Sequence, residues 1–198
     1  MTSFANMQEK STFTPAPVGA HGARLYQAID LGTQESSYYG PKRKVLLNFE
    51  LPGKLMDSGE PFTVSNWYTA SLSKKSNLRQ DLISWMGRDL IPEEIQNFDW
   101  GVVKDIPCLV NVVHHTKDDG SVIAKIQSIS PVPEGMEVAP LHGEQIIFDL
   151  ANPDDELFES LSDGIKKMIM GSPEYQTKGQ EPENNQPEFV DDILDDSI

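Results

Sequence analysis

"PFTVSNWYTASLSKKSNLRQDLISWMG", residues 61–87, changes its hydrophobic period half-way along. In residues 61–72 apolar side chains alternate with polar ones, which indicates a strand with one buried face. Trp67 is the one large ring on the polar face of this strand. From Ser76, a suitable N-cap, the apolar spacing becomes helical and ends near Gly87. The stretch therefore predicts a strand followed by a short amphipathic helix.

The segments on either side of this stretch read as further strands. Residues 23–34 and 44–51 precede it, and residues 107–115 and 121–130 follow it, the last two joined by a turn that contains Asp-Gly. Three strands, a helix and two strands is the chain order of the OB-fold, a five-stranded Greek-key barrel. We therefore expect a mainly β domain over residues 21–150.

The two ends of the chain differ in character from this domain. Residues 1–20 are polar, contain two prolines and show no periodicity, which predicts a flexible arm. Residues 151–171 predict one amphipathic helix, capped by Asn152, that packs on the barrel or on a second subunit. Residues 172–198 are rich in Pro, Gln, Asn and Glu, and predict a disordered acidic tail.

Charge is unevenly distributed along the chain. The formal net charge of the 198 residues is −15. Residues 1–133 hold 13 Lys and Arg against 14 Asp and Glu, whereas residues 134–198 hold 3 against 17. The body is therefore close to neutral with clustered positive residues, and the negative surplus belongs to the C-terminal third.

Other features of the sequence limit the class of protein. It has no apolar run long enough to cross a membrane, and the N-terminus lacks the plan of a signal peptide. Cys108 is the only cysteine and lies in an apolar run, which indicates a buried, inert thiol and excludes a disulfide within one chain. We expect a soluble protein of the cytoplasm with no membrane partner.

Signals of catalysis are weak. His114 and His115 are adjacent on a strand, so they point to opposite faces and cannot ligate one metal ion together. No phosphate-binding loop or hydrolase motif occurs. We expect no catalytic residue, no metal site and no cofactor. A metal-dependent enzyme built on the carboxylates of residues 149–159 is a third, less favoured hypothesis, since helix capping explains Asp154 and Asp155.

Basic and aromatic side chains cluster where a barrel of this kind binds nucleic acid. Such sites combine a positive groove with aromatic rings on which bases stack. The loop "SSYYGPKRK" interleaves tyrosines with basic residues, and the helix entry and the last hairpin add more. The candidate nucleic-acid-binding residues are Tyr38, Tyr39, Lys42, Arg43, Lys44, Trp67, Lys74, Lys75, Arg79, His115 and Lys117.

Each candidate also has a purely structural interpretation. The lysines and arginines of residues 42–44 could be a solvated loop. Tyr38 and Tyr39 could cover a barrel mouth, and Trp67 could pack beneath the C-terminal helix. The rival hypothesis for the whole protein is an interaction module, or an accessory subunit of a replication or virion complex. Positive clusters scattered around the barrel would favour that rival.

The chain ends in "EFVDDILDDSI", residues 188–198, which is both acidic and apolar. A recognition peptide has this character, because apolar side chains fill a partner's pocket while carboxylates meet its basic rim. On its tether the segment could also compete with nucleic acid for the protein's own basic groove. A solubilising tail would not need these apolar residues. The tail residues concerned are Phe189, Val190, Asp191, Asp192, Ile193, Leu194, Asp195, Asp196 and Ile198.

The strand segments and this ending together resemble phage-encoded single-stranded DNA-binding proteins of the OB-fold type. The resemblance covers about residues 20–150 and the last eleven residues. It implies a non-catalytic protein of the host cytoplasm that coats single-stranded DNA during phage replication, recombination or repair. It also implies recruitment of replication and recombination proteins by the tail. A homodimer or a cooperative oligomer on DNA is compatible with it.

Overall fold

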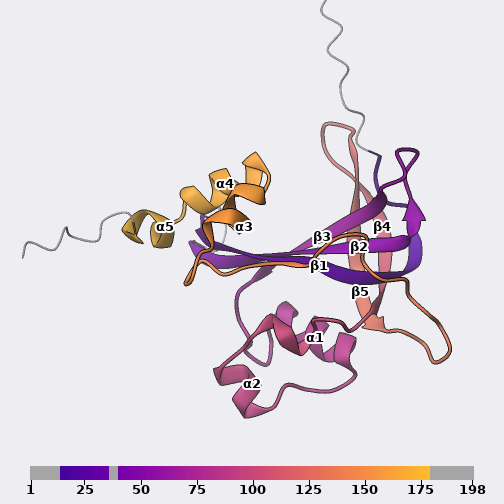
Figure 1. Ribbon diagram of the computed structural model, residues 1–198, viewed down its shortest axis with the longest axis horizontal. Helices are drawn as coiled ribbons and strands as arrows, with labels where there is room; N and C mark the ends of the chain where they lie inside the picture. The colour runs from indigo at the N-terminus through magenta and orange to yellow at the C-terminus, as the bar shows by residue number, and fades with distance from the viewer. Residues whose placement is uncertain (1–13, 36–39, 179–198) are drawn as a thin grey trace, which may run out of the picture.

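The computed structural model describes residues 14–35 and 40–178 (Figure 1). Its strands are β1 Gly19–Gln34, β2 Lys42–Leu55, β3 Pro61–Thr69, β4 Cys108–Thr116, β5 Val122–Pro131 and β6 Ile146–Phe148. Its helices are α1 Asn77–Met86, α2 Pro92–Gln96, the 3₁₀ turn η1 Trp100–Val102, α3 Asp155–Ser160, α4 Asp163–Met170 and α5 Pro173–Lys178. The prediction of a mainly β protein is confirmed.

Six strands form one sheet in the order β3-β2-β1-β4-β5, with β6 added beside β1. Each neighbouring pair along the five-strand path is antiparallel, and β6 runs parallel to β1. The long β1 pairs with β4 through its first residues and with β2 through the rest. Since β3 and β5 also contact each other, the sheet is consistent with a barrel-like fold. The sixth strand was not expected from the sequence.

Helix α1, which follows β3, begins after Ser76 and ends before Gly87, as the sequence predicts. The Ser76 hydroxyl accepts a hydrogen bond from the Arg79 N–H at 3.3 Å, and Gly87 ends the helix at φ 70°. Trp85 lies on its buried face, with its ring centroid 5.3 Å from that of Phe49. This helix therefore closes the core on the inner side of the sheet, which is the lower side in Figure 1.

Both faces of β2 are buried, but by different parts of the chain. Val45, Leu47, Phe49 and Leu51 face the inner core, as their alternation predicts. Leu46 instead belongs to a second apolar cluster on the outer face. The other buried members of that cluster are Ile29, Leu31, Phe148, Leu150, Leu161 and Ile169. The outer cluster explains how β6 and the C-terminal helices attach to the sheet. Figure 1 shows α3 and α4 on the side of the sheet opposite to α1.

The expectation of one helix over residues 151–171 is wrong, because α3 and α4 replace it. Leu161 and Ser162 adopt extended backbone, with ψ 153° and 150°, and break the helix. This break places the Leu161 side chain in the outer cluster, so tertiary packing overrides local helix propensity. Asp154, and not Asn152, is the N-cap: its carboxylate accepts bonds from the N–H groups of Glu156 and Leu157 at 2.9 and 3.0 Å.

The predicted boundaries of the arm and the tail also need correction. Residues 14–20 are part of the fold, since Ala16 is buried and its carbonyl lies 2.9 Å from Nε2 of His114. Beyond α4, helix α5 packs on β1: the Glu174 carboxylate accepts bonds from the N–H and the hydroxyl of Thr33 at 2.9 and 2.6 Å. The remainder of the predicted arm, residues 1–13, and of the predicted tail, residues 179–198, lies outside the described residues.

The prediction that the Cys108 thiol is buried is confirmed. Cys108 is fully buried, and burial raises the pKa of its thiol. Among the described helices, none is long and apolar enough to cross a membrane.

Candidate nucleic-acid interface

The start of β2 and the end of β3 lie side by side and form the floor of a shallow hollow. Lys44 is paired with Thr69, and Leu46 with Trp67. The Lys44 ammonium donates a hydrogen bond to the Thr69 hydroxyl at 3.1 Å. We call this site the lysine hollow. It has a volume of about 400 Å³ and is lined by Lys42, Lys44, Trp67, Tyr68, Thr69, Ser71, Ser73, Lys75, Ser76 and Asn77.

Trp67 presents its ring to solvent. Its side chain stands on the outer face of β3 beside exposed polar residues, and 48% of the residue remains accessible. It belongs to neither apolar cluster. The alternative that Trp67 packs beneath the C-terminal helix is therefore wrong, because that helical segment covers Leu46 and its neighbours instead. An exposed indole on a polar strand face is available to stack on a ligand.

Among the described residues, every charged side chain that lines the lysine hollow is basic. Three lysines line it, and within the described part of the chain its lining contains no carboxylate. The remaining polar groups are hydroxyls and one amide, which can donate hydrogen bonds to phosphate oxygens. Ser76 and Asn77 are at the start of α1, where the helix dipole is positive and adds to the field of the lysines.

Arg43, Lys74 and Arg79 line a different site, which we call the arginine hollow. It has a volume of about 800 Å³ and lies on the other side of the Ser71–Ser73 segment, which lines both hollows. Three aspartates accompany the three cations there: Asp30, Asp99 and Asp149. Its apolar residues are Val45, Ala70, Leu72, Leu78, Ile95, Phe98, Trp100, Ile147 and Phe148.

Both arginines of this second hollow are held in ion pairs. The Arg43 guanidinium donates from Nε to both carboxylate oxygens of Asp30 at 3.1 Å, and this bond raises the pKa of the arginine. Arg79 is 7% exposed and donates to Asp89 at 3.0 and 2.9 Å and to the Leu72 carbonyl at 3.1 Å. Arg79 braces the wall between the hollows through the Leu72 carbonyl, and both arginines are already neutralised by aspartates.

The remaining candidates lie elsewhere. His115 is an exposed residue near the end of β4, and Lys117 is in the β4–β5 turn, where its N–H bonds the Ser121 carbonyl at 2.8 Å. Neither lines the lysine hollow. Tyr38, Tyr39 and all the tail residues from Phe189 to Ile198 lie outside the described residues. The structure thus gathers Lys42, Lys44, Lys75 and Trp67, and separates the other described candidates from them.

Sequence reasoning missed the polar part of the lining. Thr69, Ser71, Ser73 and Asn77 line the lysine hollow but were not among the candidates. A signal for them existed, since the strand-to-helix connection "TASLSKKSN" is rich in hydroxyl and amide side chains.

Glu50 lies on the outer face of the sheet, toward the end of β2 that is opposite to Lys42 and Lys44. Glu50 is 6% exposed, and its carboxylate accepts a bond from the His142 N–H at 3.0 Å and lies 2.9 Å from Nδ1 of the same histidine. Burial, and next the charge of Glu50, raise the pKa of the neighbouring Tyr26.

Comparisons with known protein families and with curated proteins find no match for this chain. Within residues 14–35 and 40–178, no group of three or more His, Cys, Asp or Glu side chains is placed to hold a metal ion. Asp154, from the acidic segment of the third hypothesis, serves as a helix cap.

Proposed function

We propose that this protein binds single-stranded DNA without catalysis, through the lysine hollow and the exposed ring of Trp67. The observation that carries the proposal is this pairing of a solvent-exposed indole with three lysines and no carboxylate in the described lining. Unpaired bases offer π faces to the ring, while the phosphates that link them are attracted by the lysines.

The expected properties follow from these two interactions. Stacking of one base on an aromatic ring contributes roughly 1–3 kcal/mol and tolerates any base. Charge contacts to phosphates are blind to sequence and weaken as salt rises. The protein should therefore prefer single strands to duplexes, discriminate little among bases, and release DNA at high salt.

The fold supports an OB-fold assignment, which is part of the same proposal. The partners of β1, the helix between β3 and β4, and the contact between β3 and β5 match the plan of that barrel. Proteins of this fold bind oligonucleotides on the outer face of their second and third strands and on the adjacent loops. The lysine hollow is lined by residues of β2 and β3, which supports a site of this kind in this chain.

The resemblance to phage single-stranded DNA-binding proteins extends the proposal to roles in replication, recombination and repair. In this account Tyr38 and Tyr39 extend the stacking surface, and the acidic tail recruits partner proteins. Arg43 and Arg79 are no longer proposed as DNA contacts, because their charges are neutralised by Asp30 and Asp89. Arg79 instead supports the hollow through the Leu72 carbonyl.

A fluorescence titration tests the proposal. The full chain is titrated with oligo-dT and with a duplex of equal length at two salt concentrations, with tryptophan emission as the signal. We expect quenching and tight binding by the single strand, weaker binding by the duplex, and loss of affinity at high salt. An oligo-dT titration that leaves the emission and the mobility of the protein unchanged would favour the rival interaction module.

A further inference from the structure

Strand β6 is an edge strand with one partner. Ile146, Ile147 and Phe148 pair with β1, and within the described residues no strand pairs with the other edge of β6. The backbone groups on an unpaired edge are a template for another strand. A short edge can remain unpaired in water, but here it borders a cavity.

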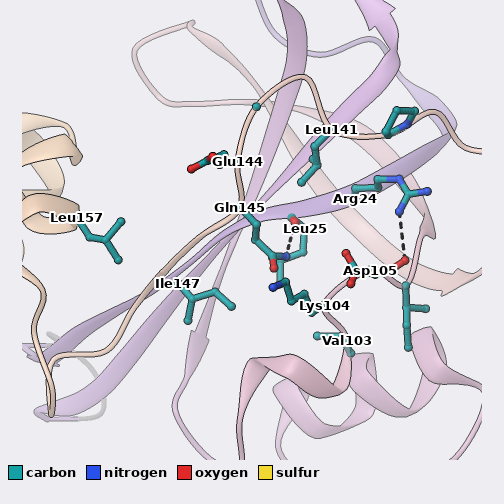
Figure 2. Close-up of a pocket in the computed structure, with 13 residues that line it drawn as sticks. Arg24, Leu25, Val103, Lys104, Asp105, Leu141, Glu144, Gln145, Ile147 and Leu157 are labelled. Carbon is teal, nitrogen blue, oxygen red and sulfur yellow. Dashed lines mark hydrogen bonds between the residues drawn. The ribbon is translucent and has the colours of Figure 1, made fainter.

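The cavity beside β6 has a volume of about 750 Å³ and is shown in Figure 2. Gln145 and Ile147 come from the β6 side, Val103, Lys104 and Asp105 from the connection before β4, and Leu157 from α3. Ile147 lines both this cavity and the arginine hollow. The apolar lining of the first cavity is Leu25, Val103, Ile106, Leu141, Ile147 and Leu157.

Gln145 supplies the observation that points to a ligand. Its Nε2 donates to the Leu25 carbonyl at 2.7 Å, as the dashed line in Figure 2 shows. Its Oε1 is buried and, among the described residues, has no hydrogen-bond partner. A buried acceptor without a donor is costly and uncommon in folded proteins. If the Gln145 side chain turned its Oε1 toward the cavity, an N–H group of an occupant would remove the cost.

The charges of this cavity distinguish it from the lysine hollow. Arg24 and Lys104 are balanced by Asp105 and Glu144. The Arg24 guanidinium donates hydrogen bonds to the backbone carbonyls of Ala139, Val138 and Asp105, at 2.8, 3.1 and 3.2 Å. A balanced lining gives no net attraction to a polyphosphate or to an acidic peptide. It complements a segment whose net charge is near zero.

We propose that this groove binds an extended segment of a partner protein, which adds a strand to the free edge of β6. The segment has a net charge near zero and apolar side chains at alternate positions, which enter the cavity on one face. The Gln145 side chain turns toward the segment, and its Oε1 accepts a hydrogen bond from a backbone N–H. This is recognition by strand addition, in which backbone bonds give affinity and side-chain pockets give specificity. The site is separate from the proposed DNA interface.

Selection from a displayed library of random decapeptides tests the inference with the full chain as bait. We expect enriched sequences with apolar residues at alternate positions and little net charge. Binding of a synthetic enriched peptide should fall about tenfold with Gln145→Leu, which removes the unpaired acceptor, and about tenfold with Ile106→Lys, which places a charge at the rim. Ile106 is 41% exposed, so its replacement leaves the core intact.

Two further measurements make the result decisive. The same peptide with N-methyl groups on alternate backbone amides should lose binding, because strand addition needs those N–H groups. Both variants should keep the wild-type affinity for oligo-dT, so failure of this inference is distinct from failure of the proposed function. Equal binding of the N-methylated peptide, no enrichment that depends on Ile106, or enrichment of acidic sequences like residues 188–198 would each overturn the inference.

Discussion

The lysine hollow and the arginine hollow each contain three basic side chains, but they differ in the acidic residues among their described lining. In the arginine hollow, Asp30, Asp99 and Asp149 offset the cations, and both arginines are committed to ion pairs. In the lysine hollow no described lining residue is acidic, and Trp67 adds an exposed ring. The number of basic residues in a site is therefore a poor guide to its field. Their counter-charges decide it.

The comparison also shows how a basic run in sequence becomes two surfaces. Lys42, Arg43 and Lys44 are consecutive, and alternation along β2 places the lysines in one hollow and the arginine in the other. Just before α1, Lys74 lines the arginine hollow and its neighbour Lys75 lines the lysine hollow. The Ser71–Ser73 segment is the common wall, and Arg79 fixes it through the Leu72 carbonyl.

The largest effect should come from reversing the charge of the lysine hollow. In a variant with Lys42→Glu, Lys44→Glu and Lys75→Glu, the three carboxylates would repel phosphates, and oligo-dT binding should vanish at physiological salt. At low salt, the slope of log affinity against log salt should fall by about 2, which corresponds to three lost phosphate contacts on a single strand. Titrations across a salt series measure both. A slope equal to that of the wild type would remove these lysines from the DNA path.

Next in size is the loss of the exposed ring. Trp67→Ala should weaken oligo-dT binding by roughly 1–3 kcal/mol and remove the fluorescence quenching, since one stacked base is lost. Trp100→Ala is the matched control, because Trp100 lines the arginine hollow and its ring lies edge-on to that of Phe98 at 5.0 Å. The opposite outcome, in which Trp100→Ala weakens binding and Trp67→Ala does not, would transfer the DNA site to the other hollow.

A smaller effect should separate two neighbouring lysines. Lys75→Glu should lower the salt slope by about 0.7, the value for one phosphate contact on a single strand, and Lys74→Glu should change it less. Lys125→Glu serves as the control for a change of net charge, since Lys125 is an exposed residue of β5 outside both hollows. Equal effects of all three would mean that only the overall charge matters.

The smallest effect on DNA is expected from Arg79, although its effect on stability should be clear. Arg79→Met keeps the length of the side chain but removes its bonds to Asp89 and the Leu72 carbonyl. Thermal unfolding should shift down by several degrees, because the Leu72 carbonyl loses the guanidinium that anchors it and Asp89 loses its charged partner. Affinity for oligo-dT, measured well below that transition, should stay near the wild-type value. A large loss of affinity in the folded variant would restore Arg79 to the DNA contacts.

Much of the fold could be predicted because its signals are local. Alternation located the five long strands, and Ser76 and Gly87 located the ends of α1. β6 was missed because three residues are too few to show a period, and its pairing with β1 joins segments far apart in sequence. The break at Leu161 was missed because it depends on an outer cluster that only the folded sheet creates.

Part of the candidate site could also be predicted, because part of its signal is local in the sequence. The polar environment of Trp67 and the positive residues near it are visible in the sequence. Period two could also have separated Arg43 from its neighbours. The pairing of Arg79 with Asp89, and the grouping of Lys75 with Lys42 and Lys44, depend on the path of the loop after β3. No local pattern encodes that path.

The central claim is that single-stranded DNA occupies the lysine hollow and leaves the arginine hollow empty. The most direct test is to follow the backbone amide and indole N–H signals of the ¹⁵N-labelled full chain by NMR during titration with oligo-dT. The account predicts saturable shifts at Lys44, Trp67 and Lys75, with the indole signal of Trp100 unmoved. Shifts centred on Arg79 and Trp100, or no shifts at low salt, would contradict it.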